Sequence, residues 1–151
     1  MKKYKKQILI GLLLIFIGIF IHPRKVIYEP KIVGMVTDET GNPVVNATVA
    51  RIGNRYFKNE EFGYEESKEF RTQSVQTDIN GNFALAELSR VEWIHNIPFT
   101  LPTVWCSSQF EVSKTGFKSF RTTSDDYEVY NENLNFCKGI VFKPQIVLKK
   151  L

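Results

Sequence analysis

The chain has 151 residues and a formal net charge of +4, with 43% hydrophobic and 24% charged residues. That length suffices for one domain with a modest core, and the composition is that of a folded protein, not a disordered or collagen-like one. Two cysteines are too few for a zinc ribbon, and the two histidines, His22 and His95, nearly exclude a multi-histidine metal site. The sequence therefore predicts no metal and no cofactor.

The positive charge is concentrated at the N-terminus. Six of the 20 basic residues lie within the first 25 positions, whereas all 16 acidic residues lie at Glu29 or later. Residues 26–151 therefore carry 14 basic and 16 acidic residues, a net charge of −2. Proteins that bind nucleic acid need a basic surface on the folded domain. We expect no nucleic-acid partner.

An apolar run of fourteen residues, ILIGLLLIFIGIFI, occupies positions 8–21. As a helix it would rise about 21 Å, less than the roughly 30 Å of a bilayer core, so local thinning of the bilayer is required. No cleavage site of the A-x-A type and no lipoprotein cysteine follows the run. We predict an uncleaved signal anchor, a single transmembrane helix over residues 8–22, with a cleaved signal peptide as the alternative.

The flanking charges predict the orientation of this anchor. Four lysines and the amino terminus precede the run, against Arg24 and Lys25 after it. By the positive-inside rule, the basic tip at residues 1–7 is cytoplasmic and the folded domain lies outside the cytoplasm, which is the periplasm if the cell is Gram-negative. We expect residues 23–30 to be a linker and residues 31–151 to form the folded domain.

The domain reads as all-β. It has no convincing helical periodicity, and about seven short β-rich runs occur at 31–37, 44–51, 74–77, 82–86, 109–113, 118–122 and 140–148. In the second run, strict alternation predicts that Val45, Ala47 and Val49 share one buried face. Strands of this length, separated by turn residues, predict a β-sandwich.

Turn chemistry separates these runs, and the residues that carry it are Asp38, Gly41, Pro43, Asp78, Asn80, Gly81 and Gly116. Gly41 supplies a positive φ, and Pro43 stops pairing until the next strand begins. Asn80-Gly81 is a strong hairpin signal because both residue types tolerate positive φ. Asp78 can accept hydrogen bonds from backbone amides further along that turn.

Three segments share a spaced pattern: Gly34-x-Val36-x-Asp38-x-x-Gly41-x-Pro43-x-x-x-Ala47-x-Val49, then Thr77-Asp78-x-x-Gly81-x-Phe83-x-Leu85, then Val112-Ser113-Lys114-x-Gly116-Phe117-Lys118. This pattern resembles the carboxypeptidase regulatory-like domain. The resemblance covers about residues 31–149 and implies a transthyretin-like (prealbumin-like) Greek-key β-sandwich. It also implies an accessory module for folding, adhesion or partner binding.

Related families with chemistry lack their signatures here. The transthyretin-like hydrolase of purine catabolism ends in Tyr-Arg-Gly-Ser, whereas this chain ends in VLKKL. Ring-cleaving dioxygenases with a similar sandwich hold iron with two tyrosines and two histidines, and only His95 lies beyond the anchor. Isopeptide-forming adhesin domains need a late-strand asparagine, which residues 140–151 lack. With no nucleophile, base and orienting group together, we expect no enzymatic activity.

Cys106 and Cys137 are the two cysteines of the chain. Outside the cytoplasm, such a pair most often forms one structural disulfide, and a redox role would favour a C-x-x-C spacing that is absent. We predict a disulfide between them, with two free buried thiols as the alternative.

Two aromatic-rich segments, residues 54–69 and 89–105, depart from a minimal sandwich. They either fold back on the sandwich as caps or present a recognition surface, and the second segment could also touch lipid headgroups. The candidate ligand-binding residues are Tyr56, Tyr64, Trp93, His95, Phe99 and Trp105.

The sequence thus predicts a non-enzymatic, membrane-anchored binding or interaction module with a protein or glycan partner outside the cytoplasm. The alternative is a membrane-held inhibitor or immunity-type protein that intercepts a toxin or hydrolase. The net charge of −2 on the domain and the acidic segment at residues 122–135 fit that alternative.

Overall fold

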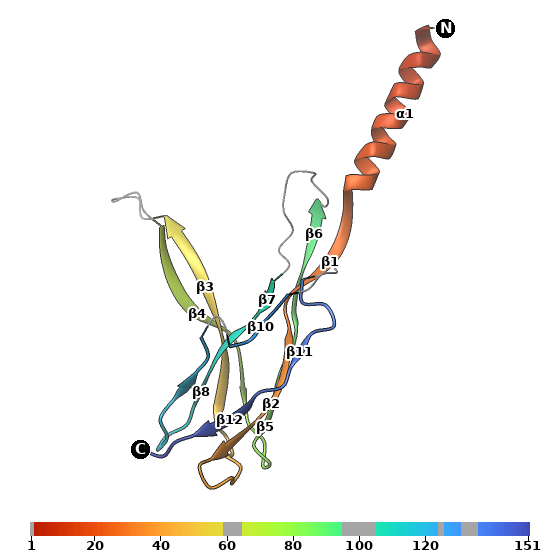
Figure 1. Ribbon diagram of the computed structural model, residues 1–151. Helices are drawn as coiled ribbons and strands as arrows, with labels where there is room; N and C mark the ends of the chain where they lie inside the picture. The colour runs from red at the N-terminus through yellow and green to blue at the C-terminus, as the bar shows by residue number, and fades with distance from the viewer. Residues whose placement is uncertain (1, 59–64, 95–104, 124–125, 131–135) are drawn as a thin grey trace.

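The computed structural model describes residues 2–58, 65–94, 105–123, 126–130 and 136–151, and the chain in these ranges is mostly β (Figure 1). The elements in chain order are α1 (Lys2–Phe20), β1 (Ile21–Glu29), β2 (Lys31–Asp38), β3 (Thr48–Lys58), β4 (Glu65–Gln76), β5 (Asn82–Leu85), β6 (Leu88–Ile94), β7 (Trp105–Ser107), β8 (Gln109–Ser113), β9 (Phe120–Arg121), β10 (Glu128–Tyr130), β11 (Val141–Phe142) and β12 (Gln145–Leu148).

Two four-stranded sheets enclose the core. In one, β2 pairs with β5 on one side and with β11 and β12 on the other; the second has the order β4-β3-β8-β9. The ring of Phe110 lies at the centre, with its centroid 6.3 Å from Phe83, 6.4 Å from Phe120 and 5.4 Å from Tyr127. Alternating aliphatic residues of β2, β3, β8 and β12 pack around it. The prediction of an all-β, sandwich-like fold is therefore confirmed.

The last predicted strand, residues 140–148, is two strands. Both β11 and β12 run parallel to β2, and they are separated at Lys143-Pro144. Proline has no N–H to donate to a ladder, which interrupts pairing at this point. Its carbonyl still contributes, because Pro144 O accepts a hydrogen bond of 3.1 Å from the N–H of Met35.

The prediction of a strand over residues 44–51 was wrong for residues 44–47. The strand begins only at Thr48 because the preceding residues turn: Asn46 has a φ of 53° and donates its N–H to Thr77 O at 3.1 Å. Ala47 and Val49 are fully buried, as the alternation predicted, but Val45 is 37% exposed. The turn rotates Val45 out of the face it was expected to share.

The prediction of a hairpin at Asn80-Gly81 was also wrong, because the strands on either side of this turn do not pair with each other. Gly81 has the expected positive φ of 74°, but among described non-glycine residues only Asn46 and Phe136 have positive φ, so Asn80 does not. The flanking strands lie in different sheets, since β4 pairs with β3 and β5 pairs with β2. Gly81 O accepts a 2.8 Å hydrogen bond from Val36 N–H, which fastens this turn to β2 and directs β5 alongside it.

Two turns use the same aspartate arrangement. The Oδ1 atom of Asp38 accepts hydrogen bonds from the N–H groups of Thr40 and Asn42, at 2.9 Å each. In the same way, Asp78 Oδ1 accepts hydrogen bonds from the N–H groups of Asn80 at 2.9 Å and Asn82 at 2.8 Å. The Thr40 hydroxyl, which donates to Asp38 Oδ1 at 2.6 Å, is the largest factor that lowers the pKa of Asp38 to about 2. Backbone N–H donors, that of Asn82 foremost, lower the pKa of Asp78. The predicted turn role of Asp78 is seen here.

The other predicted turn residues lie where expected. Gly41 and Gly116 have φ values of 85° and 84°, in the region that favours glycine. Pro43 forms an isolated antiparallel bridge with Thr37, and regular pairing resumes only at β3.

The N-terminal part differs from its prediction. Helix α1 ends at Phe20, and the chain passes directly into β1, which pairs antiparallel with β6 (Figure 1). Residues 23–30, expected as a linker, thus belong almost entirely to a strand, because Val26 is buried and the register with β6 continues to Glu29. Among the described residues, no helix is long and apolar enough to cross a membrane.

The described residues of the aromatic-rich segment 54–69 are paired strand residues, 54–58 in β3 and 65–69 in β4. Strands β3 and β4 pair from Thr48↔Gln76 to Lys58↔Glu65, with one register shift between Arg51 and Ile52, while β8 accompanies β3 only from Thr48 to Ile52. We call residues 53–58 with 65–70 the arm. In Figure 1 the arm rises on one side of the sandwich, β1 and β6 rise on the other, and β7 and β10 lie between them.

Candidate binding surface

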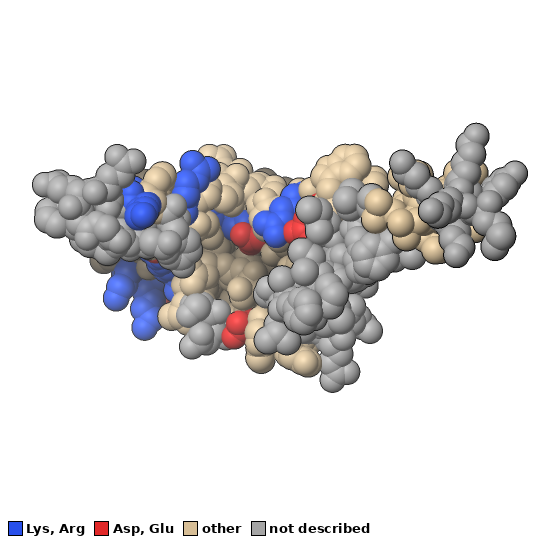
Figure 2. Space-filling model, turned by 90° about the horizontal axis from the view of Figure 1, so that it is seen from above, with Lys and Arg blue, Asp and Glu red and all other residues tan. Residues whose placement is uncertain are grey.

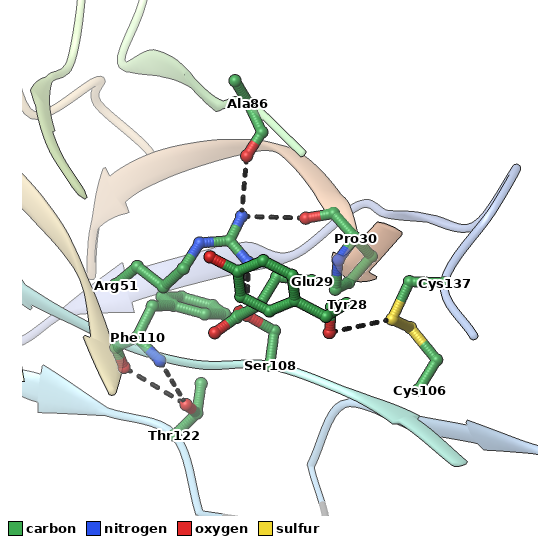
Figure 3. Close-up of polar contacts among 10 residues, drawn as sticks. All are labelled: Tyr28, Glu29, Pro30, Arg51, Ala86, Cys106, Ser108, Phe110, Thr122 and Cys137. Carbon is green, nitrogen blue, oxygen red and sulfur yellow. Dashed lines mark hydrogen bonds and ion pairs between the residues drawn. A yellow bond between two sulfur atoms is a disulfide. The ribbon is translucent and has the colours of Figure 1, made fainter. Parts of the chain in front are cut away.

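A buried arginine lies where strands β1, β6 and β7 join the sandwich. The side chain of Arg51 on β3 is fully buried and forms an ion pair with the carboxylate of Glu29 (Figure 3). Its Nη1 also donates to Ser108 Oγ at 3.0 Å, and its Nη2 donates to the carbonyls of Pro30 at 2.8 Å and Ala86 at 3.1 Å. The Ser108 hydroxyl donates to Glu29 Oε2 at 3.0 Å, which closes the network.

Each partner of Arg51 lies at a junction between two strands. Pro30 separates β1 from β2, Ala86 precedes β6, and Ser108 separates β7 from β8. One guanidinium therefore links the three places where the chain passes between the sandwich and strands β1, β6 and β7. Sequence analysis missed this role, although Arg51 continues the inward parity of Val49 and a charged residue at such a position requires a partner.

The predicted disulfide between Cys106 and Cys137 is confirmed. Cys106 lies on β7, and both residues are buried. The N–H of Cys137 donates to Ile27 O at 2.9 Å, and Cys137 Sγ lies 3.5 Å from the carbonyl oxygen of Tyr28 (Figure 3). The disulfide thus ties β7 to a turn that is itself bonded to β1.

An exposed aromatic pair includes the residue that precedes Cys106 on β7 and faces the opposite side of that strand. Trp105 and Tyr130 are opposite each other in the antiparallel pair of β7 and β10, with ring centroids 5.3 Å apart and an edge-on angle of 68°. Trp105 is 53% exposed and Tyr130 52% exposed. Because side chains alternate along a strand, the burial of Cys106 directs Trp105 outward. We call these two side chains the aromatic pair.

Of the other predicted ligand residues, the two that the structure describes, Trp93 and Tyr56, do not lie on the strands of this pair. Trp93 is 60% exposed on β6, in a different two-stranded sheet. Of Tyr56 only the backbone is described, opposite Ser67. Tyr64, His95 and Phe99 lie outside the described residues. Tyr130 was missed because residues 122–135 were interpreted by their acidic charge alone.

The arm carries a second surface of mixed character. Arg55 lies over the ring of Phe70 at 5.2 Å, and Lys68 Nζ lies 5.7 Å from the centre of the Phe57 ring. The four side chains line a shallow hollow of about 180 Å³. Seen from above, basic side chains gather over this side of the molecule (Figure 2). Phe57 and Phe70 remain 44% and 40% exposed, so the cations cover their rings only in part.

The described residues include no group of three or more His, Cys, Asp or Glu side chains that could hold a metal ion. The carboxylate of this region, Glu29, is already engaged by Arg51 and Ser108. What this part of the molecule offers to a partner is aromatic and cationic surface.

Comparison with known proteins gives matches among solved structures. No model of a known protein family matches the chain, and no curated protein matches it. Among solved structures it is similar to 3-chlorocatechol 1,2-dioxygenase from Rhodococcus opacus 1CP, with 15% sequence identity and a TM-score of 0.42 over 82% of this chain and 61% of that one. It is also similar to hydroxyquinol 1,2-dioxygenase from Pseudomonas putida DLL-E4, with 13% identity and a TM-score of 0.41 over 81% of this chain and 56% of that one.

These two structures bear on the expectation of no enzymatic activity. Both neighbours are named as enzymes, which contradicts that expectation, and we therefore correct it and do not carry it further. The chain spans about six-tenths of the length of each neighbour. Likeness at such TM-scores and identities also transfers no catalytic role to any residue of this chain.

Proposed function

We propose that this protein is a binding module whose ligand packs against the aromatic pair, Trp105 and Tyr130. The observation that carries the proposal is that two large rings stand opposite each other, each about half exposed, on strands backed by a buried disulfide. Large aromatic side chains dominate the energetics of recognition surfaces. They also lose little conformational entropy when a ligand packs on them.

The backing of the pair favours recognition over a merely exposed position. The disulfide joins β7 to the turn at Cys137, which is bonded to β1, and Arg51 holds the junction between β7 and β8. A surface held in this way is largely formed before the ligand arrives, which reduces the ordering cost of binding. The partner class that suits two exposed aromatic rings is a glycan or a protein surface.

The proposed setting is the outer side of a membrane. The apolar side chains described on α1 are exposed, with Leu9 at 68% and Leu14 at 63%, and exposed apolar surface of this kind marks contact with lipid or protein. The lysines before the apolar run support a cytoplasmic N-terminus. A disulfide is the form that cysteine pairs take outside the cytoplasm.

We further propose that the sandwich is a transthyretin-like Greek-key domain of the carboxypeptidase regulatory-like type. The motif around Asp38, Gly41, Asp78 and Gly81 supports this proposal, since these residues form the two matching turns. Accessory modules of that kind bind or position other molecules, which agrees with the aromatic pair as a ligand surface.

The test is capture from an envelope extract by the full chain in detergent, for the wild type and for Trp105→Ala and Tyr130→Ala. Ile79→Ala is the matched control, because Ile79 is 78% exposed on the Asp78 turn and also loses apolar surface. In parallel, Trp fluorescence is titrated with soluble cell-wall oligosaccharides as the glycan probe.

We expect one partner, protein or oligosaccharide, to be retained by the wild type and Ile79→Ala and lost by both aromatic variants. The identity of a protein partner then separates an envelope component from a toxin or hydrolase. Retention that is equal in all four proteins contradicts a role for the aromatic pair.

A further inference from the structure

Strand β4 has a long free edge. The order β4-β3-β8-β9 places β4 at the end of its sheet, and within the described part of the chain its twelve residues form a ladder only with β3. An unpaired edge presents a row of N–H and C=O groups that can template pairing with another chain. Proline, which would block such pairing, does not occur in β4.

The arm needs more support than one hairpin provides. Beyond Ile52, strand β3 has lost β8 as a neighbour, so β3 and β4 continue as a two-stranded ribbon. An isolated two-stranded ribbon is marginally stable in water, whereas three or more strands can be stable. The arm also leaves Phe57 and Phe70 partly exposed to solvent, so its apolar side chains are not fully used to stabilise it.

We propose that two copies of this chain associate through the free edges of β4, antiparallel, with a two-fold axis at Phe70. The occupant of the edge is thus a second copy of the same chain. The two ribbons then join into one four-stranded ribbon, in the order β3-β4-β4-β3.

Symmetry restricts the register of such a pair. A two-fold axis between antiparallel strands is perpendicular to the sheet, so it keeps each side chain on its own face. Directly opposite residues also share a face, so their positions differ by an even number and the axis passes through a residue. The axis therefore passes through one of the residues of β4, and charge distinguishes among these positions.

An axis at Phe70 places opposite charges together. Phe70 meets Phe70 of the second copy, Glu69 lies opposite Arg71 of the second copy, and Arg71 lies opposite Glu69 of the second copy. Axes at Lys68, Glu69 or Arg71 instead place two like charges directly opposite each other, which is destabilising. An axis at Ser67 places Glu66 opposite Lys68 of the second copy but Glu65 opposite Glu69, so attraction and repulsion offset each other. An axis at Thr72 or at a later residue of β4 pairs no two charged residues.

The internal ion pairs fit this register. Arg71 Nε donates to Glu111 Oε1 at 2.7 Å, and Glu69 is paired with Arg121, so all four charged groups lie on the outer face of the sheet. The hydrogen bond from Arg121 lowers the pKa of the Glu69 carboxyl, which stays ionised. A guanidinium has five donors and a carboxylate four lone-pair sites, so each group can hold its internal partner and one from the second copy.

The first test is charge reversal in the full chain in detergent, with association measured by sedimentation equilibrium. Glu69→Arg puts arginine opposite arginine twice, and Arg71→Glu puts glutamate opposite glutamate twice. We expect each variant alone to associate roughly tenfold more weakly than the wild type, since two cross-strand pairs change sign. An equimolar mixture of the two variants places opposite charges together at all four positions, and we expect it to form heterodimers as tightly as the wild type.

Three outcomes overturn the proposal: a monomeric wild type, variants that associate as tightly as the wild type, or a mixture that fails to recover association. Association through α1 would give the second outcome, because α1 does not contain these charges. Thermal unfolding of each variant shows whether the domain remains folded.

A second test does not depend on the charged variants. A cysteine placed at position 70 by Phe70→Cys meets its own copy on the axis, where opposite Cβ atoms are about 4.5–5.5 Å apart. Lys68→Cys is the matched control, because positions 68 of the two copies are four residues apart along the strands, about 13 Å, too far for a disulfide. We expect mild oxidation to give a covalent dimer with Phe70→Cys and none with Lys68→Cys. Equal yields, or no dimer with either variant, contradict the two-fold axis at Phe70.

Discussion

Arg51 and Glu29, 22 positions apart in the sequence, form an ion pair where β1 joins the sandwich. The arginine side chain is fully buried, and that of Glu29 is 17% exposed. Burial of two charges is costly unless each is paired and hydrogen-bonded. Here Ser108 and the carbonyls of Pro30 and Ala86 supply the additional bonds, so the network joins three strand junctions.

Removal of this arginine should destabilise the protein strongly. Arg51→Ala leaves the Glu29 carboxylate without its cationic partner and two carbonyls without their donor, and we expect a loss of about 3–5 kcal/mol in the free energy of unfolding. Guanidinium chloride titration followed by tryptophan fluorescence measures this loss. Arg90→Ala is the control, because Arg90 is an exposed partner of Glu92 and should cost about 1 kcal/mol or less. Equal losses in the two variants would show that the Arg51 network does not join the strands.

Glycine at position 81 should be required for two separable reasons. Gly81→Ala meets both the strain of its positive φ and a contact of 2.4 Å between the new Cβ and Val36 O. Gly41→Ala meets a φ of +85° but no atom within 4 Å, so it isolates the cost of the φ value. We expect about 1–2 kcal/mol for Gly41→Ala and clearly more for Gly81→Ala, measured by chemical denaturation. Similar costs at the two positions would mean that the β2 contact relaxes freely.

The disulfide should stabilise the fold and support the aromatic pair. Its cysteines are 31 positions apart, and closing a loop of that size contributes about 3–4 kcal/mol in the chain-entropy model. We expect Cys106→Ser with Cys137→Ser to lower stability by about that amount and to weaken retention of the partner on Trp105 and Tyr130. Denaturation and the capture assay measure the two effects. Retention at the wild-type level in the double variant would show that the pair is positioned without the disulfide.

Acid should destabilise the protein through the aspartate turns. The hydrogen bonds to Asp38 lower its pKa from 3.8 to about 2, so the folded state favours the charged form. The resulting stability is present in full above pH 3.8 and is lost as the pH falls through about 2. Asp38→Asn should therefore reduce the slope of stability against pH between about pH 4 and pH 2. Glu39→Gln, an exposed neighbour, is the control, and an unchanged slope in Asp38→Asn would contradict the role assigned to that carboxylate.

The local features of this fold were accessible from the sequence. The turns at Asp38 and Asp78 depend on hydrogen bonds within five residues, and the positive φ of Gly41 and Gly81 is a property of glycine itself. The all-β class follows from alternation and turn spacing, which are also local. The pairing of Cys106 with Cys137 could be predicted because no other cysteine was present to compete.

Tertiary structure alone decided which strands meet and which side chains become partners. Pairing of β5 with β2, and not with β4, depends on the bond from Val36 to Gly81 across 45 positions, and the order of residues around Asn80 contains no sign of it. The burial of Arg51 and the placement of Tyr130 beside Trp105 likewise depend on segments that are distant in sequence. Local preferences act through neighbouring backbone atoms, whereas register and burial depend on contacts that exist only after the chain has folded.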